Sequence, residues 1–331
     1  MSETNSLRLK GKVVQTVDPE QMLADSRSEI LKDSSVDMAP PPHDGGAALV
    51  TYRSSSFGFI ASGFGFIMPL LVLLVVAFDA PIVNMLGLAF WDNARGFTLG
   101  YYKDLLEAPI YLRVLGNTLA ISLIVTFTNV LIGYPLAHWM RGLTGRAKTI
   151  VIALVVLPWW ISVLVRTYAW IVILGNDGLV NRALQWLGLT HGPVQFLYNA
   201  FGVTIGMTAV LLPILVLPLY AAMVRIDNRL LQAAASLGAP PRTIFWKIYF
   251  PLTLPTLIAC AMLVFMFCLG FYITPAILGG GRVSMISNVL DTLINEISNW
   301  GQASAISTIL LVVTLLIYAA YRRMDQRTSA R

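Results

Sequence analysis

Long runs of apolar residues, separated by shorter polar stretches, are the dominant pattern of this 331-residue chain. A helix needs about 20 apolar residues to cross the hydrocarbon core of a bilayer. Six runs meet this length and predict transmembrane helices: Phe57–Phe78, Val114–Met140, Thr149–Leu174, Phe201–Met223, Thr256–Leu278 and Ala303–Tyr321. Several contain Pro or Gly, which membrane helices tolerate where neighbouring helices or water satisfy the freed backbone groups. The pattern predicts an all-α membrane protein with six transmembrane helices.

The composition supports this class, because 56% of the residues are hydrophobic and only 12% are charged, unlike a soluble domain. Residues 1–56 mix both charge signs and contain a Pro- and Gly-rich stretch, which is typical of a disordered tail. A signal peptide would place its apolar run directly after a short basic leader. We therefore expect a disordered tail over 1–56, a transmembrane domain over 57–321 and a short tail over 322–331.

The distribution of Lys and Arg predicts the orientation, since these residues concentrate in cytoplasmic loops. The loops after the second and fourth runs and the tail after the sixth carry most of them: Arg141, Arg146, Lys148, Arg225, Arg229, Arg242, Lys247, Arg322, Arg323, Arg327 and Arg331. Asp and Glu balance the basic residues of the other loops. We expect a multi-pass protein of the inner (plasma) membrane with both termini cytoplasmic. The net charge of +6 then reflects topology and contact with anionic membrane lipid, and indicates no nucleic-acid partner.

Side chains that commonly carry catalysis or bind metals are scattered along the chain. His43, His138 and His191 lie far apart, while Cys260 and Cys268 share one apolar run and are expected to serve packing. The sequence contains no nucleophile elbow, no HExxH motif and no GxxxxGK[ST] phosphate-binding loop. We therefore expect no enzyme activity, catalytic residue, metal or cofactor in this chain. If ATP drives the protein, a separate polypeptide must bind it.

An amphipathic segment, Asp227–Pro255, separates the fourth apolar run from the fifth. Asp227 is expected to cap a first helix by accepting hydrogen bonds from the free amides of its first turn. Leu230, Leu231 and Ala234 would form the apolar face of this helix. The QAAA run that follows Leu231 carries little side-chain bulk, so a partner protein could approach the helix backbone closely.

A bend and a second helix are expected to follow. Gly238 predicts the end of the first helix, because this position often requires a positive φ. Ala239, Pro240 and Pro241 would set the direction of the second helix, since proline is accepted in a first turn. The second helix would direct its apolar side chains, Ile244, Phe245 and Ile248, to one side. Its basic side chains, Arg242 and Lys247, would face water or lipid phosphate. Two prolines, Pro251 and Pro255, would end it. Physical reasoning alone supports a surface-bound helix and a docking surface about equally.

The segment resembles the EAA motif of ABC importer permeases, in which Glu-Ala-Ala precedes a glycine and then an apolar-x-Leu-Pro sequence. The matching positions are Gln232, Ala233, Ala234, Gly238, Ala239, Phe245, Ile248, Phe250 and Pro251. Gln232 replaces the usual glutamate and Phe250 the usual leucine. The resemblance implies coupling helices that dock on a cytoplasmic ABC ATPase dimer through Gln232, Ala233, Ala234, Gly238, Ala239, Pro240 and Phe245.

Two further motifs are similar to those of the spermidine/putrescine permease group, within a resemblance that covers about residues 60–325. They are Leu157–Trp160 with Val165–Trp170, and Thr274–Gly280 with Met285-Ile286. The resemblance implies a type I ABC importer permease fold. It also implies a second permease subunit, expected to be a different chain, and a periplasmic solute-binding protein that delivers the substrate.

The resemblance further implies a pathway for a small amine-type solute, with polyamine as the leading substrate class. Opines, other amino-acid derivatives and aminophosphonates remain open, because similar permeases transport them. Aromatic faces attract cations, so the candidates for the pathway are Trp159, Trp160, Tyr168, Phe271 and Tyr272.

Arg166 is the one ionisable residue well inside an apolar run, and such residues are costly and often functional. It lies late in the third run, where it is expected either to bind carbonyls or the partner permease, or to line the pathway. Asp291 and Glu296 are the nearest outer carboxylates, but residues five apart do not stack on one face of an α-helix. A secondary transporter is the alternative class, although the chain lacks the obvious repeat that such transporters usually show.

Overall fold

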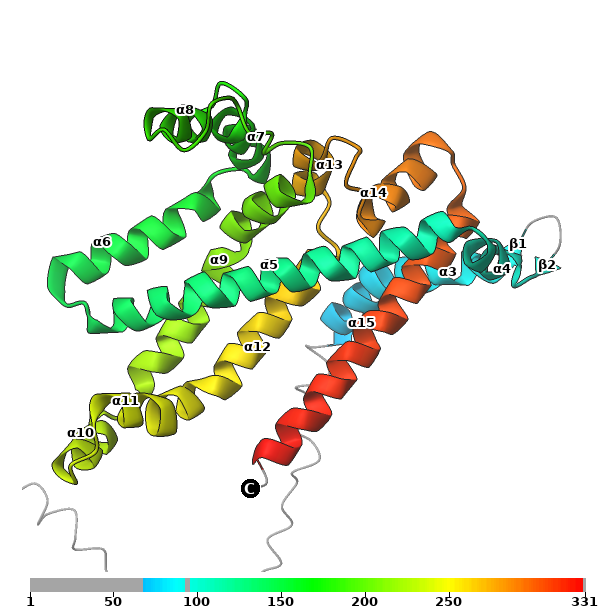
Figure 1. Ribbon diagram of the computed structural model, residues 1–331. Helices are drawn as coiled ribbons and strands as arrows, with labels where there is room; N and C mark the ends of the chain where they lie inside the picture. Colours follow the sequence, from blue (N-terminus) through cyan, green and yellow to red (C-terminus); the bar gives the residue numbers. More distant parts are fainter. Residues whose placement is uncertain (1–67, 93–95, 330–331) are drawn as a thin grey trace, which may run out of the picture. The chain divides into compact units, whose positions relative to one another are not determined.

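The computed structural model of the chain describes residues 68–92 and 96–329 (Figure 1). The predicted tail over 1–56 and the first part of the first predicted span lie outside the described residues. Among the described residues, six helical segments are long and apolar enough to cross a membrane: Met68–Leu88, Pro109–Gly142, Val163–Trp186, Ala200–Arg225, Pro241–Leu269 and Trp300–Arg323. A short antiparallel pair, β1 (Trp91–Asp92) and β2 (Gly96–Phe97), follows the first of them.

Three helices form the main core: α5 (Pro109–Gly142), α9 (Ala200–Arg225) and α12 (Phe250–Leu269). Their facing side chains are fully enclosed, as Met207 and Val264 illustrate. Small residues allow the helices to approach closely, which is the usual way that helices pack in membranes. The packing of these three helices holds the segments at their two ends in place.

A second apolar cluster surrounds the last helix, α15 (Trp300–Ser329), which packs against α3 (Ala80–Leu88) and α4 (Gly100–Glu107). Its buried members are Ala89, Leu105, Val114, Ile286, Leu293, Ala303, Ala305 and Ile306. The outward faces of the spans expose large apolar side chains, for example Phe78 at 66%. Such exposure fits a molecule whose surrounding solvent is lipid, and it confirms the predicted class of membrane protein.

The predicted boundaries are confirmed within a few residues for the second, fourth and sixth spans, but not for the others. The first span was predicted to end at Phe78, whereas the helix continues to Leu88 through a π-helical turn, η1 (Val75–Asp79). The wider turn ends two residues before Pro81. It removes the α-type geometry in which the proline ring would clash with the carbonyl one turn earlier.

The third predicted span is broken into separate helices rather than continuous. It consists of α6 (Gly145–Val156), a 3₁₀ turn η2 (Leu157–Trp160) and α7 (Val163–Leu174). Pro158 cannot donate the hydrogen bond that a continuous helix requires, and the chain becomes extended at Ile161. A further helix, α8 (Leu179–Trp186), then packs against α7.

The prediction that Pro251 and Pro255 end a separate helix was wrong. The helical run is continuous over Pro241–Leu269, through α11 (Pro241–Ile244), the π-turn η3 (Phe245–Tyr249) and α12. As in the first span, the π-turn ends two residues before a proline. The same physical reason therefore applies at both places.

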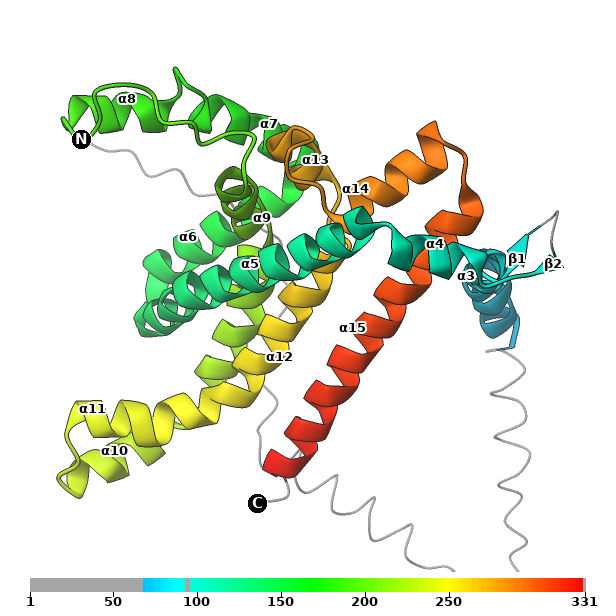
Figure 2. The same cartoon turned by 45° about the vertical axis from the view of Figure 1, so that its right-hand side comes forward.

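The fifth span ends at Leu269, earlier than the predicted Leu278. A short helix, α13 (Ile273–Gly279), follows and accommodates Pro275 within its first turn. The chain continues through α14 (Ile286–Asp291) and a third π-turn, η4 (Thr292–Glu296). Both views place α13 and α14 near one end of α12 and the segment around α11 at the other end (Figures 1 and 2).

Candidate functional site

The segment between α9 and α12 forms a helical hairpin, which begins with α10 (Asn228–Ser236). Asp227 is the predicted N-cap, and its Oδ1 accepts the backbone amide of Arg229 at 2.8 Å. Leu231 packs against the main core, as predicted for the apolar face. Leu230 does not, because it is 54% exposed. The helix is therefore attached along a narrower apolar stripe than the sequence predicted.

Gly238 forms the predicted bend with a φ of +83°. Its amide donates to the carbonyl of Ala235 at 2.9 Å, and the amide of Ala239 donates to the carbonyl of Ala234 at 3.1 Å. This pair of hydrogen bonds is the Schellman arrangement, which satisfies the last carbonyls of a helix and requires a left-handed residue. Pro240 then precedes α11 and Pro241 lies in its first turn, as the sequence predicted for the prolines that set the direction of the second helix.

The outer surface of the hairpin consists of small or exposed residues. Gln232, Ala233, Gly238 and Pro240 are exposed, while Ala234 and Ala239 are half-buried. These are six of the seven residues that the sequence assigned to docking. The seventh, Phe245, packs against the main core and thus attaches the hairpin to it.

Two apolar residues on the hairpin were missed by the sequence reasoning. Leu237, directly before the bend, is 89% exposed, and Trp246 is 62% exposed. Exposed apolar side chains on a projecting element are typical of a surface that a partner covers. The signal was present in the sequence, because an apolar residue at the tip of a tight bend has no neighbours in its own chain.

Arg141, at the C-terminal end of α5, joins the two sides of the hairpin at its base. Its guanidinium donates to the Asn228 side chain and, at 3.5 Å, to the carbonyl of Ile226. The same group lies 4.9 Å from the centre of the Tyr249 ring, which is a cation–π contact. We call Arg141, Ile226, Asn228 and Tyr249 the hairpin root. It connects the beginning and the end of the hairpin to α5.

An aromatic cluster lies beside the root, between α5 and the π-turn η3. The ring of His138 stands edge-on to Phe245 and Tyr249, at centroid distances of 5.6 and 5.0 Å. Tyr134 contacts Phe245 in the same manner, and its hydroxyl hydrogen-bonds to Thr253 at 3.1 Å. Edge-to-face contacts of this kind are directional, so the hairpin and α5 are expected to move together.

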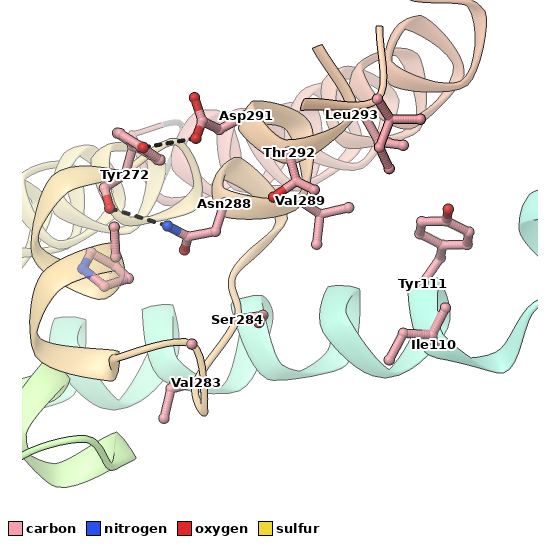
Figure 3. Close-up of a pocket in the computed structure, with 14 residues that line it drawn as sticks. Ile110, Tyr111, Tyr272, Val283, Ser284, Asn288, Val289, Asp291, Thr292 and Leu293 are labelled. Carbon is pink, nitrogen blue, oxygen red and sulfur yellow. Dashed lines mark hydrogen bonds between the residues drawn. The ribbon is translucent and has the colours of Figure 1, made fainter. Parts of the chain in front are cut away.

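A cavity of about 390 Å³ lies at the opposite end of α12 (Figure 3). Its walls come from the start of α5, from α13 and from the segment of α14 and η4: Ile110, Tyr111, Tyr272, Pro275, Ala276, Gly281, Val283, Ser284, Asn288, Val289, Asp291, Thr292, Leu293 and Ile297. The Tyr272 hydroxyl donates to Oδ2 of Asp291 at 2.8 Å. This hydrogen bond raises the pKa of the Tyr272 phenol, and burial and the charges of Asp291 and Glu296 raise it further.

The predicted pathway residues do not gather in one place. Tyr272 lines the cavity, and Phe271 next to it packs against the main core. Trp159, Trp160 and Tyr168 are 55%, 88% and 59% exposed and do not line the cavity. Their assignment to a pathway stays a prediction.

Arg166 lies in the first turn of α7, not late in a span, because the predicted third span is broken just before it. Its Nε and Nη1 are enclosed and have no hydrogen-bond partner in the described part of the chain. Thr167 beside it hydrogen-bonds to Thr274 of α13 at 3.3 Å. Two enclosed donor nitrogens of Arg166 are therefore unpaired, within the described residues, beside the α7–α13 contact.

Comparison with protein families matches residues 64–330 to the binding-protein-dependent transport system inner membrane component family. The spermidine/putrescine transport system permease protein PotB of Haemophilus influenzae is 38% identical over 226 residues, which are 68% of this chain and 79% of that protein. PotB of Escherichia coli strain K12 is 33% identical over 70% of this chain and 83% of that protein. The putative 2-aminoethylphosphonate permease PhnU of Salmonella typhi is 28% identical over 80% of this chain and 93% of that protein.

Solved structures show the same fold. A chain of a bacterial alginate ABC transporter, crystallised with a periplasmic protein that holds an alginate pentasaccharide, superposes with a TM-score of 0.66. The match is 20% identical and covers 82% of this chain and 96% of that chain. A chain of the inward-facing MetNI methionine ABC transporter gives a TM-score of 0.51 at 17% identity, over 65% and 94% of the two chains. These likenesses concern the fold alone.

Proposed function

We propose that this chain, which belongs to the binding-protein-dependent transport system inner membrane component family, forms part of the translocation pathway for polyamines. The chain is a multi-pass inner membrane permease subunit of an ABC importer and is not itself an enzyme. The observation that carries the substrate class is the 38% identity to a spermidine/putrescine permease over most of both chains. Spermidine and putrescine are the substrates to test first.

The helical hairpin is the proposed docking element for a cytoplasmic ABC ATPase. Its surface of small side chains, its left-handed bend and the exposed Leu237 support this role. The basic residues of the hairpin and of the loop after α5 support a cytoplasmic position for this end, and therefore cytoplasmic termini. The absence of a phosphate-binding loop in the sequence agrees with ATP hydrolysis by a separate chain.

Two further partners complete the proposed importer. A periplasmic solute-binding protein would deliver the polyamine at the outer end, where the cavity lies. A second permease, of a different sequence, would complete the pathway. Arg166 supports an association between chains, because its enclosed Nε and Nη1 have no hydrogen-bond partner in the described part of the chain, and a carbonyl or carboxylate from a partner would stabilise them.

A continuous helical run joins the hairpin, the proposed ATPase end, to the proposed outer end, and this supports coupling between them. The helical run Pro241–Leu269 contains 29 residues and therefore spans about 40 Å from the hairpin to the turn before α13. Arg141 of the hairpin root connects the hairpin to α5 as well, so a displacement of the hairpin would also move α5. ATPase closure that moves the hairpin would thus move α5, whose first residues line the cavity, and α12, which leads into the turn before Tyr272.

Reconstitution of the importer in liposomes tests the proposal. This chain, its partner permease and the ATPase are combined with the binding protein encoded alongside them, and uptake of labelled putrescine or spermidine is measured with and without ATP. We expect ATP-dependent uptake of a polyamine. Uptake of 2-aminoethylphosphonate in preference to polyamines would contradict the substrate, and uptake that needs no ATPase would contradict the transporter class.

A further inference from the structure

The cavity at the outer end of α12 carries a polar wall with an uncompensated negative charge. Tyr272, Ser284, Asn288, Asp291 and Thr292 contribute polar groups to it, and apolar side chains form the remainder. Its volume of about 390 Å³ lies within the range of small-molecule sites, which is about 300–1,000 Å³. It is therefore large enough to receive a small solute.

Asp291 is held in place by neutral donors only. Its Oδ2 accepts the Tyr272 hydroxyl at 2.8 Å, and its Oδ1 accepts the Asn295 amide at 2.7 Å (Figure 3 shows the first). No Lys or Arg forms an ion pair with Asp291 among the residues whose side chains the structure describes; Arg282, in the neighbouring loop, is exposed. A carboxylate has about four acceptor positions, so two remain for a cationic donor.

Glu296 adds a second negative charge to the same side. In an α-helix, Glu296 and Asp291 would not share a face, because they are five residues apart. The intervening segment is the π-turn η4, in which the amide of Ile297 donates to the carbonyl of Thr292. Hydrogen bonds between residues five apart bring such residues onto one side of the turn. Both carboxylates accordingly act on the Tyr272 phenol and raise its pKa.

The cavity wall is firmly attached to the rest of the fold. The amide of Ile286 donates to Thr118 of α5 at 2.9 Å, and the Ser287 hydroxyl donates to the carbonyl of Phe271 at 2.6 Å. Asn288 reaches the carbonyl of Tyr272 at 3.4 Å. These contacts fix α14 to α5 and to the α12–α13 turn. The carboxylate and the tyrosine are thus held in a preorganised position.

We propose that this cavity binds one primary ammonium group of a small-molecule amine, with Asp291 as the charged partner and the ring of Tyr272 beside it. Ammonium groups combine charge pairing with attraction to aromatic faces, and this wall offers both. Glu296 would increase the local concentration of cations near the cavity mouth. The site is a receiving position at the outer end, and it rests on the proposed function as a polyamine importer.

Direct binding to the assembled importer tests the inference. The complex of this chain, its partner permease and the ATPase is purified without the binding protein, and equilibrium binding of labelled putrescine is measured. Asp291→Asn removes the charge and keeps the shape and the acceptor for Tyr272. Asp104→Asn, an exposed carboxylate on α4 outside the cavity, is the matched control. Uptake by the liposome importer is measured in parallel.

We expect wild type and Asp104→Asn to bind putrescine equally, Asp291→Asn to bind it at least about tenfold more weakly, and 1,4-butanediol not to compete. Equal binding by all three proteins, or no binding by wild type, overturns the inference. If wild type imports polyamine yet the cavity binds none, only this inference fails. If it imports no polyamine, the proposed function fails.

A lysine of the docking binding protein would offer the same ammonium chemistry, and a second measurement separates it from the solute. Stimulation of ATP hydrolysis by the binding protein should be unchanged in Asp291→Asn. Lost stimulation with intact putrescine binding assigns the cavity to the binding protein and overturns the inference. If both are lost, Asp291→Glu decides: recovered putrescine binding supports the ammonium site, and continued loss overturns it.

Discussion

Gly238 offers a sharp test of the hairpin, because its importance comes from the backbone alone. Its φ is +83°, and a Cβ added there would meet no atom within 4 Å. A side chain at this position therefore costs conformational free energy without any steric clash. The left-handed region costs an L-residue about 1–2 kcal/mol, whereas Asn adopts it readily. Gly238→Val and Gly238→Asn, with side chains of similar size, separate the backbone angle from simple bulk.

A cost of about 1–2 kcal/mol lowers the population of the bent hairpin by about 5- to 30-fold. We expect Gly238→Val to weaken ATPase binding by this factor and Gly238→Asn to stay within about threefold of wild type. The amount of permease in the membrane should not change, because the bend is exposed and contributes nothing to the main core. The assay titrates purified ATPase onto the solubilised permease pair and is followed by ATP-driven uptake.

Two results would refute the reasoning. Wild-type affinity in Gly238→Val would show that the left-handed bend is not needed for docking. An equal loss in Gly238→Val and Gly238→Asn would show that any side chain at this surface blocks the ATPase, and that the backbone angle is irrelevant.

Three other predictions test the remaining parts. Arg141→Met removes the guanidinium of the hairpin root, so uptake per ATP hydrolysed should fall several-fold while ATPase binding persists. Arg146→Met, an exposed control at the start of α6, should leave that ratio unchanged. Ala233→Leu should abolish co-purification of the ATPase with a change in permease stability of only about 0.5 kcal/mol, and intact co-purification would exclude close approach at this face. Gly206→Val places a Cβ 2.3 Å from a side chain of α13, so thermal stability should fall by about 1–3 kcal/mol. Gly116→Ala is the control, because its Cβ meets nothing within 4 Å. Equal melting of the two variants would contradict the packing.

Features that depend on neighbours in the sequence were predicted well. The cap at Asp227 and the bend at Gly238 follow from local hydrogen bonding and backbone preference, and both are confirmed. Three spans follow from hydrophobic length alone. The errors arose at prolines, since the sequence does not show whether Pro81 or Pro251 stops a helix or follows a π-turn that accommodates it. Pro158, by contrast, marks a real break.

The hairpin root and the cavity were decided by contacts between distant residues. Arg141 reaches Tyr249 across more than a hundred positions, and Thr118 holds the amide of Ile286, which is 168 residues away. Neither contact leaves a trace in local pattern. The relation of Asp291 to Glu296 changed for a smaller reason, because a π-turn alters which residues share a face.

The sequence by itself determined that this chain spans a membrane and where the hairpin between its fourth and fifth spans bends. Those properties follow from apolar length, charge distribution and the φ that a glycine allows, which are all local. Tertiary structure alone decided how the hairpin is joined to α5 and that one carboxylate, two tyrosines and an asparagine line a common cavity. Such sites depend on how α5, α12 and α14 pack together, and packing is a property of the whole fold.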